Sequence, residues 1–129
     1  MVILIHMGTM MKKKIMVLED DRDIREIIGL LLDEENYEVK LYPDIRSFRK
    51  DLLFTDPSLV ILDVRLPDGS GHDLCREVKN DQRTLGVPVL MMSAHCSVAE
   101  VNRKCYPDDF IAKPFSIDDF VARVNAVVN

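Results

Sequence analysis

The chain has 129 residues, of which 47% are hydrophobic and 30% are charged, a balance typical of one globular domain with a sizeable core. Its formal net charge of −5 argues against a nucleic-acid-binding face. The apolar run at the start is too short to span a membrane and lacks the features of a secretory signal. We expect residues 1–11 to be a disordered or non-native leader and residues 12–129 to form the domain.

Five short apolar runs, separated by segments with helical spacing, predict five strands. Runs of this kind, bounded by turn residues, fit parallel strands that are buried on both faces of a sheet. The predicted strands are 15–18, 37–42, 59–62, 87–92 and 110–112.

Each predicted strand is followed by a predicted helix. Ile24, Ile28 and Leu31 lie on one helical face, and Asp23 with Glu26 offers a capping box for this first helix. Similar apolar stripes begin after Pro43-Asp44, after Gly69-Ser70-Gly71 and after Ser116, which is the expected N-cap of the last helix. The weakest helical pattern lies between Cys96 and Lys104. Strand-helix alternation predicts an α/β fold, with a doubly wound five-stranded parallel sheet and helices on both faces.

The chain has three cysteines, Cys75, Cys96 and Cys105, and no secretory signal. This usage favours buried free thiols in a reducing compartment, and we expect a cytoplasmic protein. A zinc site is disfavoured because no paired Cys-x-x-Cys and no complete ligand set is present.

Three consecutive carboxylates, Glu19, Asp20 and Asp21, follow the first predicted strand. Two like charges about 4 Å apart repel by roughly 4 kcal/mol at an effective dielectric constant near 20. Such a cluster must either take up protons or hold a cation.

Reactive side chains also lie at the ends of three later strands, namely Asp63, Ser93 and Lys113. Because ligands bind beyond the carboxyl ends of the strands in open parallel sheets, we expect these groups to meet the carboxylates at one edge. Carboxylates and a backbone carbonyl suffice to hold Mg²⁺. Asp63 would then attack phosphorus and become an acyl phosphate, while the metal and Lys113 offset charge and Ser93 donates to a phosphate oxygen.

The stretches IMVLEDD, LVILDVRLPDGSG, PVLMMSA and FIAKPF, in this order, carry a resemblance to a known family. Asp20 and Asp63 are 43 residues apart, and Asp63 and Ser93 are 30 residues apart. The chain from residue 12 to residue 129 resembles the receiver domains of two-component response regulators. The resemblance implies a flavodoxin-like sheet with strand order 2-1-3-4-5.

The same resemblance implies a role for individual residues. It makes Asp63 the phosphoacceptor and Lys113 the partner of the phosphoryl group. It also implies that Asp21 is not a ligand and that the bond before Pro114 is cis. The implied Mg²⁺ ligands are Glu19, Asp20, Asp63 and the backbone carbonyl of Arg65, and the implied switch residues are Ser93 and Phe110.

The partners implied are a sensor histidine kinase or phosphotransfer protein, and a downstream protein target or a missing output domain. A surface built from the fourth helix, fifth strand and fifth helix would report phosphorylation, and it could also form a homodimer. We expect neither nucleic acid nor membrane to bind this domain. The chain would catalyse its own phosphorylation and dephosphorylation and no other reaction.

One departure from the family lies between Ser93 and Lys113, which are 20 residues apart, about two fewer than is usual. The turn before the fifth strand reads Cys105-Tyr106-Pro107, so we expect a shortened or shifted fourth helix. Three alternatives stay open: a pseudo-receiver acting as an interaction module, a Mg²⁺-dependent phosphohydrolase, and the receiver portion of a DNA-binding transcriptional regulator. The phosphohydrolase is disfavoured by Arg65, which stands where such enzymes commonly carry a second acid, and a nucleotide-binding protein by the lack of a Gly-rich phosphate loop.

Overall fold

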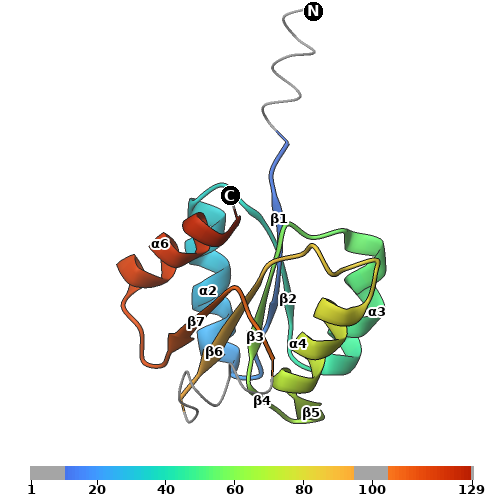
Figure 1. Ribbon diagram of the computed structural model, residues 1–129. Helices are drawn as coiled ribbons and strands as arrows, with labels where there is room; N and C mark the ends of the chain where they lie inside the picture. The colour runs from blue at the N-terminus through green and yellow to red at the C-terminus, as the bar shows by residue number, and fades with distance from the viewer. Residues whose placement is uncertain (1–10, 95–104, 129) are drawn as a thin grey trace, which may run out of the picture.

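A computed structural model describes residues 11–94 and 105–128 of the protein. The main sheet has five parallel strands in the order β2-β1-β3-β6-β7 (Figure 1). Counted along the chain within this sheet, the order is 2-1-3-4-5, which confirms the predicted doubly wound, flavodoxin-like fold. The strands are β1 (Lys14–Leu18), β2 (Glu38–Tyr42), β3 (Leu59–Asp63), β6 (Val89–Ser93) and β7 (Asp109–Ala112).

The central strands are buried on both faces, as near-continuous apolar runs predict. Every residue of β3 and β6 is buried. Successive residues of β3 alternate between two hydrophobic clusters: Val60 and Leu62 pack on one face of the sheet, and Leu59 and Ile61 on the other. The sheet therefore needs a layer of helices on each side.

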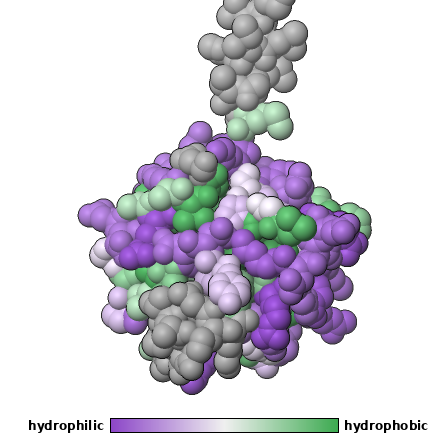
Figure 2. All heavy atoms as spheres, viewed as in Figure 1, coloured by the Kyte–Doolittle hydropathy of each residue, from purple (hydrophilic) through white to green (hydrophobic). Residues whose placement is uncertain are grey.

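Four helices of the described residues form these layers. Helices α2 and α6 cover one face and α3 and α4 cover the other (Figure 1). None of them is long and apolar enough to cross a membrane. Figure 2 shows one face of the molecule, which is mostly hydrophilic with separate hydrophobic patches. The helices are α2 (Arg22–Glu34), α3 (Ile45–Thr55), α4 (Gly71–Asn80) and α6 (Ile117–Val128).

The N-termini of the helices follow the predicted turn residues, with one exception. Asp44 and Ser70 cap α3 and α4, and the Ser116 hydroxyl accepts from the Asp119 amide at 3.0 Å. The predicted capping box of the first helix is wrong. Asp21 is the N-cap of α2, because its backbone is extended and its carboxylate accepts from the Ile24 amide at 3.1 Å.

A short antiparallel hairpin, β4 (Arg65–Leu66) and β5 (Gly69–Ser70), follows β3 and was not predicted. At its tip, the Asp68 carboxylate accepts from the amides of Ile45 and Arg46, at 2.9 and 3.1 Å. These two amides belong to the first turn of α3, whose N–H groups have no partner within the helix. The hairpin is thereby fastened to α3.

Two of the three cysteines form a disulfide, Cys75 with Cys105. The predicted burial of these side chains is confirmed, but their predicted free state is wrong. The reason is tertiary: α4 packs beside the segment that enters β7, and 30 residues of sequence separate the two cysteines. The predicted leader, the predicted helix between Cys96 and Lys104, and Cys96 itself lie outside the described residues, apart from the exposed Met11.

Candidate functional site

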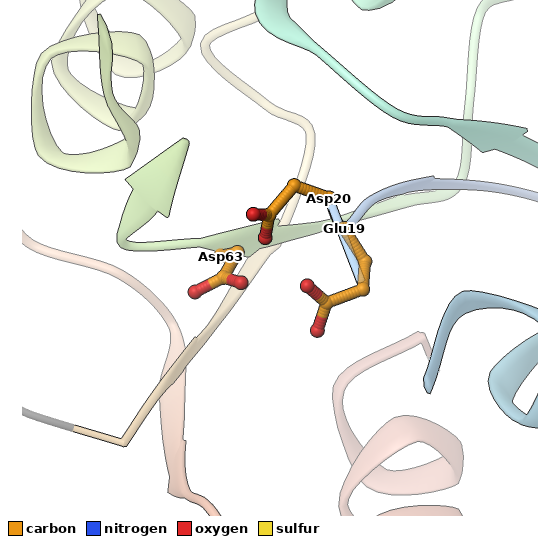
Figure 3. A group of neighbouring side chains, drawn as sticks. All are labelled: Glu19, Asp20 and Asp63. Atoms are coloured by element: carbon orange, nitrogen blue, oxygen red, sulfur yellow. The ribbon is translucent and has the colours of Figure 1, made fainter. Parts of the chain in front are cut away.

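The carboxylates of Glu19, Asp20 and Asp63 converge at the carboxyl ends of β1 and β3 (Figure 3). One carboxylate oxygen from each residue lies within 4.8 Å of the others. The two strands are neighbours in the sheet, with Leu18 paired to Leu62, so the residues that follow them meet at one edge. Glu19 and Asp63 are buried and Asp20 is exposed. This confirms the predicted convergence, and such a set of oxygen donors suits a hard divalent cation.

Lys113 comes from the opposite end of the sequence and lies between two of these carboxylates. Its ammonium donates to the Glu19 carboxylate, and to the Asp63 carboxylate at 3.0 Å. The Lys113 side chain is only 14% exposed, which strengthens its interaction with both anions. The predicted placement of Lys113 beside Asp63 is therefore confirmed.

The buried charges shift the pKa values of this group. Burial, together with hydrogen bonding to Asp63, raises the pKa of Glu19 to about 8, although the Lys113 ammonium opposes the rise. Burial lowers the pKa of Lys113, but its hydrogen bond to Glu19 and the charge of Asp63 outweigh that effect and leave the pKa raised. A proton on Glu19 and a cation in the cluster therefore compete for the same carboxylate oxygens.

Arg25 of α2 supports the loop that carries Glu19 and Asp20. Its guanidinium donates to the backbone carbonyl of Glu19 at 2.9 Å and to that of Asp20 at 3.3 Å. Sequence reasoning missed this residue because no motif distinguishes it from the other charges of the helix. Asp21, in contrast, caps α2 and lies outside the carboxylate group, as predicted.

Gly71 fits where the backbone of Asp63 comes close to α4. A Cβ atom on Gly71 would lie 1.9 Å from the carbonyl oxygen of Asp63, and the Gly71 amide donates to the Val64 carbonyl at 2.8 Å. The sequence showed Gly71 merely as part of a Gly-Ser-Gly turn. Its contact with the end of β3 appears in the fold alone.

The remaining predicted residues lie at or near this edge. Ser93 ends β6 and is buried, and its carbonyl accepts from the Lys113 amide at 2.9 Å. Phe110 of β7 is buried in the core cluster on the α3 and α4 face. The bond between Lys113 and Pro114 is cis, as predicted. Arg65 follows Asp63 by two residues with an exposed side chain, and the role of its carbonyl as a ligand stays a prediction.

An apolar groove of about 510 Å³ runs from α2 to Lys113. Two of its side chains are strongly exposed, Ile27 at 51% and Ile117 at 56%. The apolar stripe of α2 is thus wider than the part of it that packs on the sheet. The groove is lined by Ile24, Ile27, Ile28, Leu31, Ala94, Lys113, Pro114, Phe115 and Ile117.

Comparison with known proteins agrees with this geometry. The family model described as the response regulator receiver domain matches residues 15–125. The transcriptional regulatory protein GltR of Pseudomonas aeruginosa is 33% identical over 118 residues, which cover 90% of this chain and 49% of GltR. The chain spans about half the length of the curated relatives it matches.

Two solved structures share the fold. The non-phosphorylated HemR receiver domain of Leptospira biflexa superposes with a TM-score of 0.83 at 28% identity, over 92% of this chain and 95% of that one. The receiver domain of the sensor histidine kinase PA1611 of Pseudomonas aeruginosa superposes with a TM-score of 0.80 at 20% identity, over 92% of this chain and 98% of that one. The PA1611 domain has a magnesium ion coordinated in its active-site cleft, but at this identity the likeness shows the fold alone.

Proposed function

Because the chain belongs to the family of response regulator receiver domains, we propose that it accepts a phosphoryl group on Asp63 in a Mg²⁺-dependent reaction and signals by changing shape. The observation that carries this proposal is the contact of the Lys113 ammonium with the Asp63 carboxylate, beside the converging acids Glu19 and Asp20. The donor is a phosphohistidine on a sensor histidine kinase or a phosphotransfer protein. We place the reaction in the cytoplasm, where such phosphoryl groups derive from ATP.

In the proposed transfer, an Asp63 carboxylate oxygen attacks phosphorus and the bond from phosphorus to the donor imidazole breaks. The imidazole leaves with the electron pair of that bond and takes a proton, and Asp63 becomes an acyl phosphate. Glu19, Asp20, Asp63 and the Arg65 carbonyl would hold Mg²⁺, which offsets charge on the phosphoryl oxygens when it is bound.

Lys113 and Ser93 act directly on the incoming group. The Lys113 ammonium already lies against Asp63, so it can offset the negative charge that phosphorylation adds. We propose that the Ser93 hydroxyl donates to a phosphoryl oxygen, moves inward and leaves space that Phe110 fills. The surface around β7 and α6 would then report the change to a partner.

The apolar groove beside Lys113 supports a protein as the phosphoryl donor. A small phosphodonor needs access to Asp63 alone, whereas a donor protein must bury surface nearby to hold its histidine in place. Ile27 and Ile117 provide exposed apolar area next to Lys113. We propose that a helix of the donor seats here.

For the output, we propose either a separate protein target or an output domain in the same polypeptide. The second choice is favoured by relatives that are about twice as long and include a transcriptional regulatory protein. The chain itself turns over no other substrate in this proposal. A pseudo-receiver would keep the fold and take no phosphoryl group.

The test is labelling by acetyl phosphate with and without Mg²⁺. We expect one phosphoryl group per chain, dependence on Mg²⁺ and complete loss in Asp63→Asn. Asp21→Asn is the matched control, because it removes a neighbouring charge outside the cluster and Asn still caps a helix. Absence of label on the parent chain would establish the pseudo-receiver, and repeated turnover of a phosphomonoester would establish the phosphohydrolase.

A further inference from the structure

The disulfide between Cys75 and Cys105 joins two segments of the core that are distant in the sequence but pack together in space. Cys75 lies in α4, and Cys105 lies four residues before β7. Their Cα atoms are 6.2 Å apart, a separation that a disulfide spans without backbone movement. Both residues are buried, Cys75 fully and Cys105 at 3% exposure.

This cross-link connects the helix beside Asp63 to β7, the strand that carries the proposed switch residue Phe110. α4 begins at Gly71, which lies against the carbonyl of Asp63, and the segment from Cys105 leads into the strand that carries Phe110. Cys75, Cys105 and Phe110 belong to the same hydrophobic cluster. A movement of Phe110 would therefore disturb the cluster that also contains the cysteine pair.

Polar contacts already fasten the same two segments. The Lys79 ammonium of α4 pairs with the Asp108 carboxylate, and that carboxylate accepts from the Val89 amide at 2.7 Å. The Asp108 amide donates to the Val89 carbonyl at 2.8 Å. These polar contacts tie the two segments together independently of the disulfide.

We propose that Cys75 and Cys105 form a reversible redox pair, and that their oxidation restrains the response of β7 to phosphorylation. The second part rests on the proposed function. In the disulfide-bonded structure the Lys113 ammonium still lies 3.0 Å from the Asp63 carboxylate, so oxidation leaves the phosphoacceptor site assembled. The effect falls on the response to phosphorylation.

Both oxidation states fit this site. Free cysteines pack as small apolar side chains, so the reduced pair keeps the cluster filled. In a glutathione-buffered compartment the thiols are the resting state, and a disulfide there is usually transient and regulatory. Neither cysteine belongs to the carboxylate cluster that would hold the cation.

The oxidant in this proposal is a small disulfide such as oxidised glutathione. The Cys105 thiolate attacks one sulfur and releases one glutathione thiolate, and the Cys75 thiolate then attacks the Cys105 sulfur and releases the second. Two cysteine thiols are oxidised to one disulfide, the small disulfide is reduced to two thiols, and the two protons go to the released thiolates. Because both cysteines are buried, a local opening of the segment at Cys105 precedes the first step.

The first measurement is peptide mapping of the full chain without reductant, after treatment with oxidised glutathione and again after dithiothreitol. We expect a linked pair of peptides containing Cys75 and Cys105 that dithiothreitol separates. Cys96→Ser is the matched control and keeps the link, whereas Cys75→Ser and Cys105→Ser lose it. No link, or a link through Cys96, overturns the proposal.

The second measurement is hydrogen exchange of residues 105–112 with Mg²⁺ and beryllofluoride, a mimic of the phosphoryl group, on the reduced and the oxidised parent chain. We expect the change caused by beryllofluoride to be smaller in the oxidised chain by about threefold or more. Labelling by acetyl phosphate should agree between the two forms within about twofold. Equal exchange responses overturn the restraint. If the reduced chain neither responds nor takes label, the proposed function fails, while the peptide link still reports on the redox pair by itself.

Discussion

The two faces of the sheet differ in that one carries an open apolar groove and the other a covalent cross-link. On the α2 and α6 face an open apolar groove leads to Lys113. On the α3 and α4 face, a disulfide, the Lys79–Asp108 ion pair and the bonds from Asp68 to α3 fasten one segment to the next. An open apolar surface is suited to bind a partner. We call the α3 and α4 side the closed face, and it transmits movement because its elements shift together. We infer that the groove serves the donor, and that the fastened α3 and α4 face passes a change at Asp63 on to β7.

Reducing the disulfide should cause the largest change, because it removes the covalent part of the closed face. A cross-link over 30 residues stabilises the folded state by about 3 to 4 kcal/mol, chiefly by restricting the unfolded chain. We expect the melting temperature of the oxidised parent chain to exceed that of the reduced chain by on the order of 10 °C. Calorimetry with and without dithiothreitol measures it.

Two variants check the source of that difference. Cys75→Ser should melt at the same temperature in both conditions, and Cys96→Ser should keep the full difference. A parent chain that melts identically when oxidised and reduced would show that Cys75 and Cys105 do not cross-link this face.

A charge in the open groove should separate the two kinds of phosphodonor. Ile27→Asp places a carboxylate on exposed apolar surface next to Lys113, where a donor protein would have to desolvate it. We expect transfer from the cognate phosphohistidine protein to fall by about tenfold to a hundredfold, and labelling by acetyl phosphate to stay within about twofold of the parent. Radiolabel transfer from each donor measures both rates.

Leu30→Asp is the matched control for this variant. Leu30 is 67% exposed on the same helix but lines a separate depression beside β2. Both substitutions introduce a carboxylate on the exposed part of the same helix. Similar losses of protein-dependent transfer in both variants would show that the groove has no special part in donor binding.

Loosening the hairpin tests a polar tie of the closed face. Asp68→Ala removes the acceptor of two amides in the first turn of α3, and the loss of such a cap costs about 1 to 2 kcal/mol. Asp68→Asn should cost less, since it keeps one acceptor oxygen. Urea unfolding compares the three chains. Indistinguishable midpoints would mean that the Asp44 cap and packing hold the start of α3 without help from Asp68.

The sequence was sufficient to predict the parts of the site that follow directly from strand ends. Glu19, Asp20 and Asp63 meet because parallel neighbouring strands end at one edge, and periodicity alone located those strands. Arg25 and Gly71 were missed, because one acts through a side chain that reaches back to a loop and the other through a close backbone contact. Neither leaves a local pattern.

The same limit explains the errors about caps and cysteines. Asp21 and Asp23 are both acidic residues near the start of α2, and the extended backbone of Asp21, which no sequence pattern marks, makes it the cap. Cys75 and Cys105 pair because α4 packs beside the segment that enters β7. The sequence argued against a disulfide, because the chain has few cysteines and no secretory signal. Pairings that depend on distant segments need the fold.

The last prediction concerns Glu19, which lies at the carboxyl end of β1, on the edge of the sheet between the two faces. Its pKa is raised to about 8, so between its ordinary value of 4.5 and about 8 the folded chain binds a proton that the unfolded chain has released. Stability increases with pH wherever the unfolded chain binds more protons, and here it binds fewer. The metal-free protein should therefore lose stability as pH rises from about 5 to about 8, and Glu19→Gln, which imitates the protonated acid, should lose less.

Mg²⁺ competes with this proton, so added Mg²⁺ should raise the melting temperature of the parent chain more at pH 8 than at pH 6. Melting curves in EDTA and in Mg²⁺ measure both effects, with Asp23→Asn as an exposed acidic control. Equal pH slopes for the parent and Glu19→Gln would show that the proton resides elsewhere in the cluster, and the site would then hold its cation through Asp20 and Asp63 without displacing a proton from Glu19.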